Sequence, residues 1–136
     1  PYLVGIIGED LNGEVFGDSL KNLEISDEYL IKISKRPTTV KTRIIAQHQQ
    51  ISRIDCESTE NLYVADEEIV WQRCAGLIDQ VDVVIISDYL KGLLSDKLLS
   101  RLITSANSNG KKILIDPKGK NYQKYENATL LTPNRK

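Results

Sequence analysis

The sequence predicts an α/β fold built on a parallel β-sheet. Short apolar runs at residues 82–87, 112–116 and 129–132 have the length and composition of buried strands, and the first is expected to be buried on both faces. Segments with apolar residues at helical spacing lie before the first run and between the first and second runs. Because strands that alternate with helices favour right-handed crossovers in one sheet, we expect the three strands to lie side by side.

Length and composition restrict the class of protein. A chain of 136 residues can form one hydrophobic core but not two ordinary domains. The hydrophobic and charged fractions, 40% and 27%, are typical of a globular protein, and a net charge of -1 gives no general attraction to nucleic acid or to membranes. No apolar run spans a bilayer and no signal sequence opens the chain, so we expect a cytoplasmic protein. Cys56 and Cys74 lack metal-ligand spacing and are expected to be reduced thiols.

The first segment predicts a strand, a turn and a helix. Residues 2–7 are strand-like, and apolar residues recur at helical spacing from Val15 to Leu23. The turn at 8–13 contains two glycines but lacks the dinucleotide and Walker signatures. A phosphate cradle and an ordinary helix cap both fit this turn, and the cap is the favoured interpretation.

Residues 29–56 interrupt the alternation of strands and helices. Runs at 29–34, 38–47 and 51–55 are β-prone, so we expect a small separate sheet, laid over the main one or extended from it. Polar side chains fall mainly on odd positions, which share one face of an uninterrupted strand; they are Lys41, Arg43, Gln47, Gln49 and Arg53. That face suits a phosphorylated or hydroxyl-rich ligand, or it is a solvated outer face. His48 is interpreted as a turn residue rather than a catalyst.

Two helices flank the run at 82–87. The first begins near Ala65, carries acids in its first turn where the helix dipole favours them, and has one apolar face; that face consists of Val70, Cys74, Leu77 and Ile78. The second is expected to begin at an N-cap, Ser95, and to end at Gly110.

Polar residues follow each of the three expected strands, where open α/β sheets bind ligands. They are Asp88, Lys91, Asp116, Lys118, Asn134 and Lys136. Lysines pair with phosphate oxygens, and carboxylates bind magnesium or sugar hydroxyls, so the mixture suits phosphoryl transfer. Simple tight turns are the alternative. One histidine gives little support to Ser-His or Cys-His catalysis.

Several motifs together resemble the ribokinase-like carbohydrate kinases. They are Thr-Thr-Val-Lys-Thr-Arg at 38–43, Gln-Gln-Ile-Ser-Arg-Ile-Asp at 49–55, Ser-Asp-Tyr-Leu-Lys-Gly at 87–92, Asp-Pro-Lys-Gly at 116–119 and Leu-Leu-Thr-Pro-Asn-Arg-Lys at 130–136. Within this family the Lys-x-Arg, Gln-Gln-x-x-Arg-x-Asp and Asp-Pro-Lys-Gly motifs, in this order, are similar to the heptose 7-phosphate kinase branch. Enzymes of that branch stand alone or form the kinase half of a bifunctional heptose enzyme.

The resemblance implies a three-layer ribokinase-like α/β fold with a small β lid. Residues 1–136 would be the central part of one kinase domain, with 29–56 as the lid and with the N- and C-terminal parts of the domain outside the sequence. The implied reaction is ATP-dependent phosphorylation of D-glycero-β-D-manno-heptose 7-phosphate at the anomeric hydroxyl, for ADP-heptose and lipopolysaccharide core synthesis. ATP and Mg²⁺ are the implied cofactors, and a second copy of the chain is the implied partner through the lid.

The resemblance also implies roles for particular residues. ATP contacts are implied for Asn134, Arg135 and Lys136, which match the start of the family's Asn-x-x-Glu segment. The candidate contacts for sugar, phosphate or metal are Lys41, Arg43, Asp88, Lys91 and Lys118. No residue is assigned as a metal ligand. The catalytic aspartate would follow Lys136, so these residues are expected to be inactive alone. A kinase for another sugar or a nucleoside, and a non-catalytic sugar-phosphate-binding module, remain alternatives.

Overall fold

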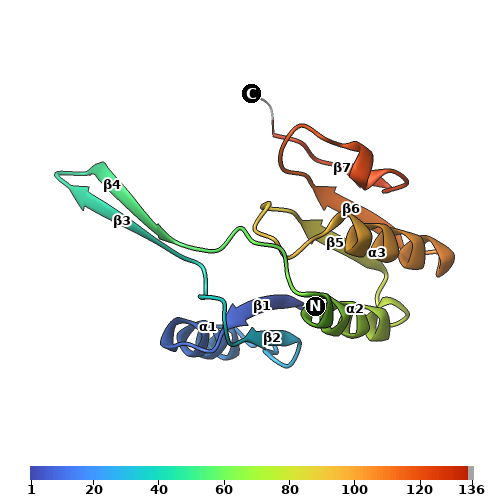
Figure 1. The fold of residues 1–136 in the computed structure, drawn as a ribbon, viewed down its shortest axis with the longest axis horizontal. Helices are drawn as coiled ribbons and strands as arrows, with labels where there is room; N and C mark the ends of the chain where they lie inside the picture. Colours follow the sequence, from blue (N-terminus) through green and yellow to red (C-terminus); the bar gives the residue numbers. More distant parts are fainter. Residues whose placement is uncertain (135–136) are drawn as a thin grey trace. The chain divides into compact units, whose positions relative to one another are not determined.

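The structure, a computed structural model, describes residues 1–134 and divides the chain into two compact units (Figure 1). The first unit is Pro1–Ser58, and the second begins at Thr59. Within the described residues, none of the helices combines the length and the apolar character that a membrane span requires.

In the first unit a helix follows a short strand, as the sequence predicts. Strand β1 (Gly5–Gly8) leads into helix α1 (Leu11–Asn22), and β1 pairs in parallel with β2 (Leu30–Ile33). The buried apolar side chains of this unit are Ile7, Leu20, Ile31 and Ile33. Ile7 lies on the opposite face of the two-stranded sheet from Ile31 and Ile33, because the register pairs Ile7 with Lys32 and Ile6 with Ile31.

Asp10 caps helix α1, which confirms the helix-cap interpretation of the turn. Its Oδ1 accepts a hydrogen bond from the Gly13 amide at 2.8 Å, and its Oδ2 accepts one from the Thr38 amide at 2.8 Å. Hydrogen bonds from the Thr38 side chain and from the Thr38 and Gly13 amides lower the pKa of Asp10. The Thr38 hydroxyl in turn accepts from the Gly8 amide at 2.8 Å. The start of α1 is thus hydrogen-bonded to the segment just before strand β3 (Val40–Ala46).

The remaining strands of the first unit form an antiparallel ribbon, β3 (Val40–Ala46) and β4 (Gln49–Cys56) (Figure 1). The expectation of one small sheet over 29–56 is therefore wrong for its first strand, because β2 pairs with β1. Lys41 pairs with Asp55 and Arg43 with Arg53, which confirms a shared odd-numbered face in this part. A register shift after Ile44 interrupts the alternation before Gln47 and Gln49.

A two-residue turn joins the ribbon strands, and both of its residues adopt left-handed backbone, Gln47 at φ 48° and His48 at φ 65°. Positive φ at both positions is the type I′ geometry that matches the twist of a hairpin. This conformation confirms His48 as a turn residue. It costs a non-glycine residue about 1–2 kcal/mol.

Replacing His48 with glycine is expected to stabilise the ribbon by up to about 1 kcal/mol, because glycine adopts this conformation without the steric cost. Amide hydrogen exchange of the paired residues of β3 and β4 measures the effect. His48→Ala is the matched control, since alanine keeps the strain. Faster exchange in His48→Gly than in His48→Ala would contradict the explanation.

The second unit contains a three-stranded parallel sheet in the order β5-β6-β7, so the predicted adjacency of the three strands is confirmed. Its elements are α2 (Val64–Ile78), β5 (Val83–Ser87), α3 (Asp96–Ser108), β6 (Lys112–Asp116), the 3₁₀ helix η1 (Gln123–Tyr125) and β7 (Leu130–Leu131). Ser95 caps α3 as predicted, with its hydroxyl accepting from the Leu98 amide at 3.0 Å. Helix α3 packs against both β6 and α2.

One face of this sheet is buried and the other is open. Ile86, Ile113 and Ile115 are buried with the apolar face of α3; that face consists of Leu98, Leu99, Leu102, Ile103 and Ala106. On the opposite face Ile85 is 70% exposed and Val83 is 41% exposed. The prediction that β5 is buried on both faces is therefore wrong for the described chain, because α3 covers one face only.

Candidate functional site

The carboxyl ends of β5, β6 and β7 bring polar residues to one edge of the sheet. Asp88 follows β5, and its amide donates to the Asp116 carbonyl at 3.0 Å, so the parallel pairing continues one residue beyond β5. Lys118 lies two residues after β6, and Asn134 lies three residues after β7. The structure thus brings Asp88 and Lys118 close together, as the strand pattern predicted. Arg135 and Lys136 lie outside the described residues.

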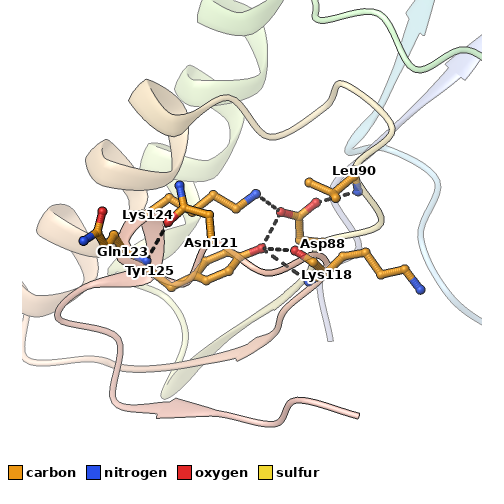
Figure 2. Close-up of polar contacts among 7 residues, drawn as sticks. All are labelled: Asp88, Leu90, Lys118, Asn121, Gln123, Lys124 and Tyr125. Carbon is orange, nitrogen blue, oxygen red and sulfur yellow. Dashed lines mark hydrogen bonds and ion pairs between the residues drawn. The ribbon is translucent and has the colours of Figure 1, made fainter. Parts of the chain in front are cut away.

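The Asp88 carboxylate is buried and is held by three donors (Figure 2). Lys124 Nζ and Tyr125 Oη each lie 2.6 Å from Oδ2, and the Leu90 amide donates to Oδ1 at 2.7 Å. The side chains of Lys124 and Asp88 are 8% and 2% exposed. We call Asp88, Lys124 and Tyr125 the edge cluster. Both oxygens of the Asp88 carboxylate thus accept hydrogen bonds from groups of the same chain.

Asp88 and Lys124 are charged at neutral pH, whereas Tyr125 is neutral. Burial acts to raise the pKa of Asp88, but hydrogen bonds from Lys124, Tyr125 and the Leu90 amide outweigh it and hold the pKa below its ordinary value. Burial acts to lower the pKa of Lys124, but the bond to Asp88 outweighs it and raises that pKa. Burial, followed by the bond to Asp88, raises the pKa of Tyr125, so its hydroxyl keeps its proton. A carboxylate, an ammonium and a phenol therefore meet at this edge.

Two loops meet at the edge cluster. In the loop after β6, the Lys118 amide donates to Tyr125 Oη at 3.4 Å, and Asn121 Oδ1 accepts from the Gln123 amide at 3.1 Å where η1 begins. Gly119 has φ 87°, and a Cβ there would lie 3.2 Å from Cδ1 of Leu90, in the loop after β5. The Leu90 side chain thus packs close to the backbone of the loop after β6 at Gly119.

The loop after β5 depends on a glycine at its end. Gly92 has φ 73°, and a Cβ on this residue would lie 1.7 Å from the carbonyl oxygen of Glu60. Its own carbonyl accepts from the Leu62 amide at 3.1 Å. Residues 60–62 therefore pack directly against the loop that carries Lys91, and a side chain larger than that of glycine does not fit at position 92.

The odd-numbered face of the ribbon carries acids as well as bases. Lys41 Nζ lies 3.0 Å from Asp55 Oδ2 and 2.9 Å from Glu57 Oε2. Hydrogen bonds to Glu57 and Asp55 raise the pKa of Lys41. Arg53 Nε contacts Asp55 Oδ1 at 2.8 Å, whereas the exposed Arg43 lies opposite Arg53 in the ladder. The sequence pattern predicted a cationic face, but the structure gives a face of mixed charge.

The described residues do not build a metal centre by themselves. Within residues 1–134, no group of three or more His, Cys, Asp or Glu side chains could hold a metal ion. The Asp88 carboxylate does not fit Mg²⁺, because the Lys124 ammonium lies 2.6 Å from Oδ2. Cys56 and Cys74 are free thiols, and burial raises the pKa of Cys74 to about 11.

Sequence reasoning missed Lys124 and Tyr125 as partners of Asp88. They lie 36 and 37 residues away along the chain, and no motif joins them to Asp88. The available signal was the two tyrosines, Tyr122 and Tyr125, in an otherwise polar loop, because a buried tyrosine usually finds a partner for its hydroxyl. Tyr125 is 1% exposed.

The sequence matches the pfkB family of carbohydrate kinases over residues 1–136. It is 43% identical to the bifunctional protein HldE of Helicobacter hepaticus over 135 residues, which are 99% of this chain and 28% of that protein. It is 45% identical to the bifunctional protein HldE of Helicobacter pylori strain HPAG1 over 134 residues, which are 98% of this chain and 29% of that protein. The chain thus spans less than a third of the length of these relatives.

Solved structures share the fold at low sequence identity. A putative phosphofructokinase from Staphylococcus aureus has a TM-score of 0.75 at 15% identity, covering 96% of this chain and 41% of that one. The Arabidopsis thaliana ribokinase, complexed with ribose and ATP, has a TM-score of 0.67 at 17% identity, covering 97% of this chain and 42% of that one. These likenesses confirm the predicted ribokinase-like α/β fold.

Proposed function

The chain belongs to the pfkB family of carbohydrate kinases, and from this premise we propose that it is part of a heptose 7-phosphate kinase. The proposed reaction transfers a phosphoryl group from ATP to the anomeric hydroxyl of D-glycero-β-D-manno-heptose 7-phosphate, for ADP-heptose and lipopolysaccharide core synthesis. The observation that carries the proposal is the identity of 43% and 45% to two bifunctional proteins HldE over nearly the whole chain. The three motifs of the heptose branch support it.

We further propose that residues 1–136 form the central part of one kinase domain. The likeness to solved kinases supports this, because it covers 96–97% of this chain but 41–42% of those chains. The catalytic base is proposed to lie in a part of the domain that these residues do not include. Activity is therefore to be measured on the parent protein, expressed from its complete reading frame.

The proposed contacts follow from charge and position. Lys91 and Lys118 lie in the loops after β5 and β6, where ammonium groups can neutralise phosphate oxygens. Lys41 and Arg43 on the ribbon are proposed to bind the sugar phosphate, and Asn134, Arg135 and Lys136 to bind ATP. Mg²⁺ is proposed to arrive with the ATP phosphates, since this ion is usually held by phosphates, waters and one or two carboxylates. Phosphoryl transfer relies mainly on such positioning and charge neutralisation.

Association of two copies through the ribbon is also proposed. The face that carries the even-numbered residues includes apolar side chains, with Ile44 44% exposed and Ile54 59% exposed. Exposed apolar side chains of neighbouring strands favour burial against a partner. Light scattering of the parent protein measures the number of subunits.

Substrate competition tests the proposed acceptor. Heptose 7-phosphate is expected to support ATP consumption and to remain the preferred acceptor in the presence of unphosphorylated heptose, ribose or adenosine. A preference for an acceptor without a phosphate would instead favour another sugar or nucleoside kinase. Binding of heptose 7-phosphate without ATP consumption would favour a non-catalytic binding module.

Replacing Arg43 with glutamate is expected to raise the KM for heptose 7-phosphate about 10- to 100-fold, because the new carboxylate repels the sugar phosphate. The KM for ATP should change little. Arg73→Glu on α2 is the matched control, since Arg73 is also an exposed arginine. Equal kinetic changes in the two variants would remove Arg43 from the proposed site.

A further inference from the structure

We propose that Lys124 and Tyr125 are positioning residues for phosphoryl transfer, because with Asp88 they fix the loops after β5 and β6 in one geometry. The loop after β5 carries Lys91, and the loop after β6 carries Lys118. This inference rests on the proposed function, since it assigns a task to side chains that do not themselves touch the substrate.

The contacts of Asp88 join the two loops directly. Its Oδ1 accepts from the Leu90 amide at 2.7 Å, which fixes the turn of its own loop. Its Oδ2 accepts from Lys124 Nζ and Tyr125 Oη, each at 2.6 Å, and these donors belong to the other loop (Figure 2). A single carboxylate therefore accepts hydrogen bonds from both loops.

Burial distinguishes this cluster from an ordinary surface ion pair. The side chains of Lys124 and Asp88 are 8% and 2% exposed, and Tyr125 is 1% exposed. Desolvation largely offsets the attraction of a buried ion pair, so apolar side chains of similar volume would serve stability as well. The charged pair adds a fixed relative geometry of the two loops, because its hydrogen bonds form in one arrangement only.

The cluster reaches Lys118 through the backbone. The Lys118 amide donates to Tyr125 Oη at 3.4 Å, while its side chain extends away from Asp88 (Figure 2). The backbone of Lys118 is thus held by the cluster and its ammonium lies outside it. Since a misplacement of about 1 Å can cost about 100-fold in rate, a lysine at this place needs a fixed backbone.

The test compares Lys124→Met and Tyr125→Phe with the parent protein. For Lys124→Met we expect a loss of about 100-fold in kcat/KM for the sugar phosphate and exchange of the Leu90 amide at least about tenfold faster. Tyr125→Phe removes the hydrogen bond to Asp88 and the bond from the Lys118 amide, and for this variant we expect a loss of about tenfold in kcat/KM. Lys124→Arg should restore part of the rate, because it keeps the charge at Asp88. Lys120→Met, in the same loop, is the matched control and should leave both readouts unchanged.

A purely structural role predicts a different result. Lys124→Met would then lower the unfolding temperature but keep kcat/KM below that temperature, and this outcome overturns the proposal. If Lys124→Met does not fold, Tyr125→Phe decides by the same criteria. Unchanged exchange of the Leu90 amide in the folded variants also overturns the proposal, and it does so whether or not the parent protein phosphorylates heptose 7-phosphate. If the parent protein prefers another sugar, the variants are compared by their kcat/KM for that sugar instead of for heptose 7-phosphate.

Discussion

Replacing Gly92 with alanine is expected to lower the free energy of unfolding by roughly 3 kcal/mol or more. The new Cβ would lie 1.7 Å from the Glu60 carbonyl oxygen and 2.4 Å from the Glu60 carbonyl carbon. These are backbone atoms, so residues 60–62 must move as a segment. The positive φ of 73° adds strain for any residue with a Cβ. Urea unfolding, followed by the fluorescence of Trp71 on α2, measures the change.

Gly110→Ala is the matched control for this prediction. Gly110 has a similar φ of 65°, but nothing lies within 4 Å of a Cβ at this position. The control therefore reports the backbone strain alone, which we expect to cost about 1 kcal/mol. Equal destabilisation in the two variants would show that the contact with Glu60 does not constrain the loop.

Replacing Asp88 with alanine is expected to cost about 3–5 kcal/mol, because the Lys124 ammonium would remain buried without its counter-charge. The double variant Asp88→Ala/Lys124→Met removes both charges and should regain part of this loss. Urea unfolding of the two single variants and the double variant measures the coupling. A cost below about 1 kcal/mol for Asp88→Ala, or additive costs in the double variant, would contradict the account of the edge cluster.

The same ion pair predicts how the difference between the parent protein and Asp88→Ala varies with pH. The pKa of Asp88 is lowered by folding, so its contribution is present above the ordinary value of 3.8 and is lost as pH falls through the folded pKa. The pKa of Lys124 is raised, so its contribution is present below 10.5 and is lost as pH rises through the folded pKa. Between these limits the difference in stability should stay constant.

Local pattern was sufficient to predict most of the second unit. The apolar runs gave β5, β6 and β7, helical spacing gave α2 and α3, and the hydroxyl of Ser95 marked the start of α3. Their order in the sheet followed from the crossover rule, because each strand is connected to its neighbour along the chain. A helix cap was likewise predicted for the turn at 8–13, although the sequence did not single out Asp10 as the capping residue.

Other features depend on contacts that the local pattern does not encode. Residues 29–34 alternate like the ribbon strands, so the sequence did not reveal that β2 pairs with β1. The run of Val83 to Ile86 is apolar throughout, so it did not reveal which face α3 covers. Asp88 was identified as a polar residue at the edge, but its partners come from a loop that only the folded sheet brings near.

The phosphorylated product of the parent protein tests the central claim most directly. After incubation with ATP, Mg²⁺ and heptose 7-phosphate, ³¹P NMR should show a new phosphate on the anomeric oxygen, formed in equal amount to ADP. An unchanged heptose 7-phosphate spectrum, or a new phosphate at another position, would contradict the proposal that this chain is part of a heptose 7-phosphate kinase.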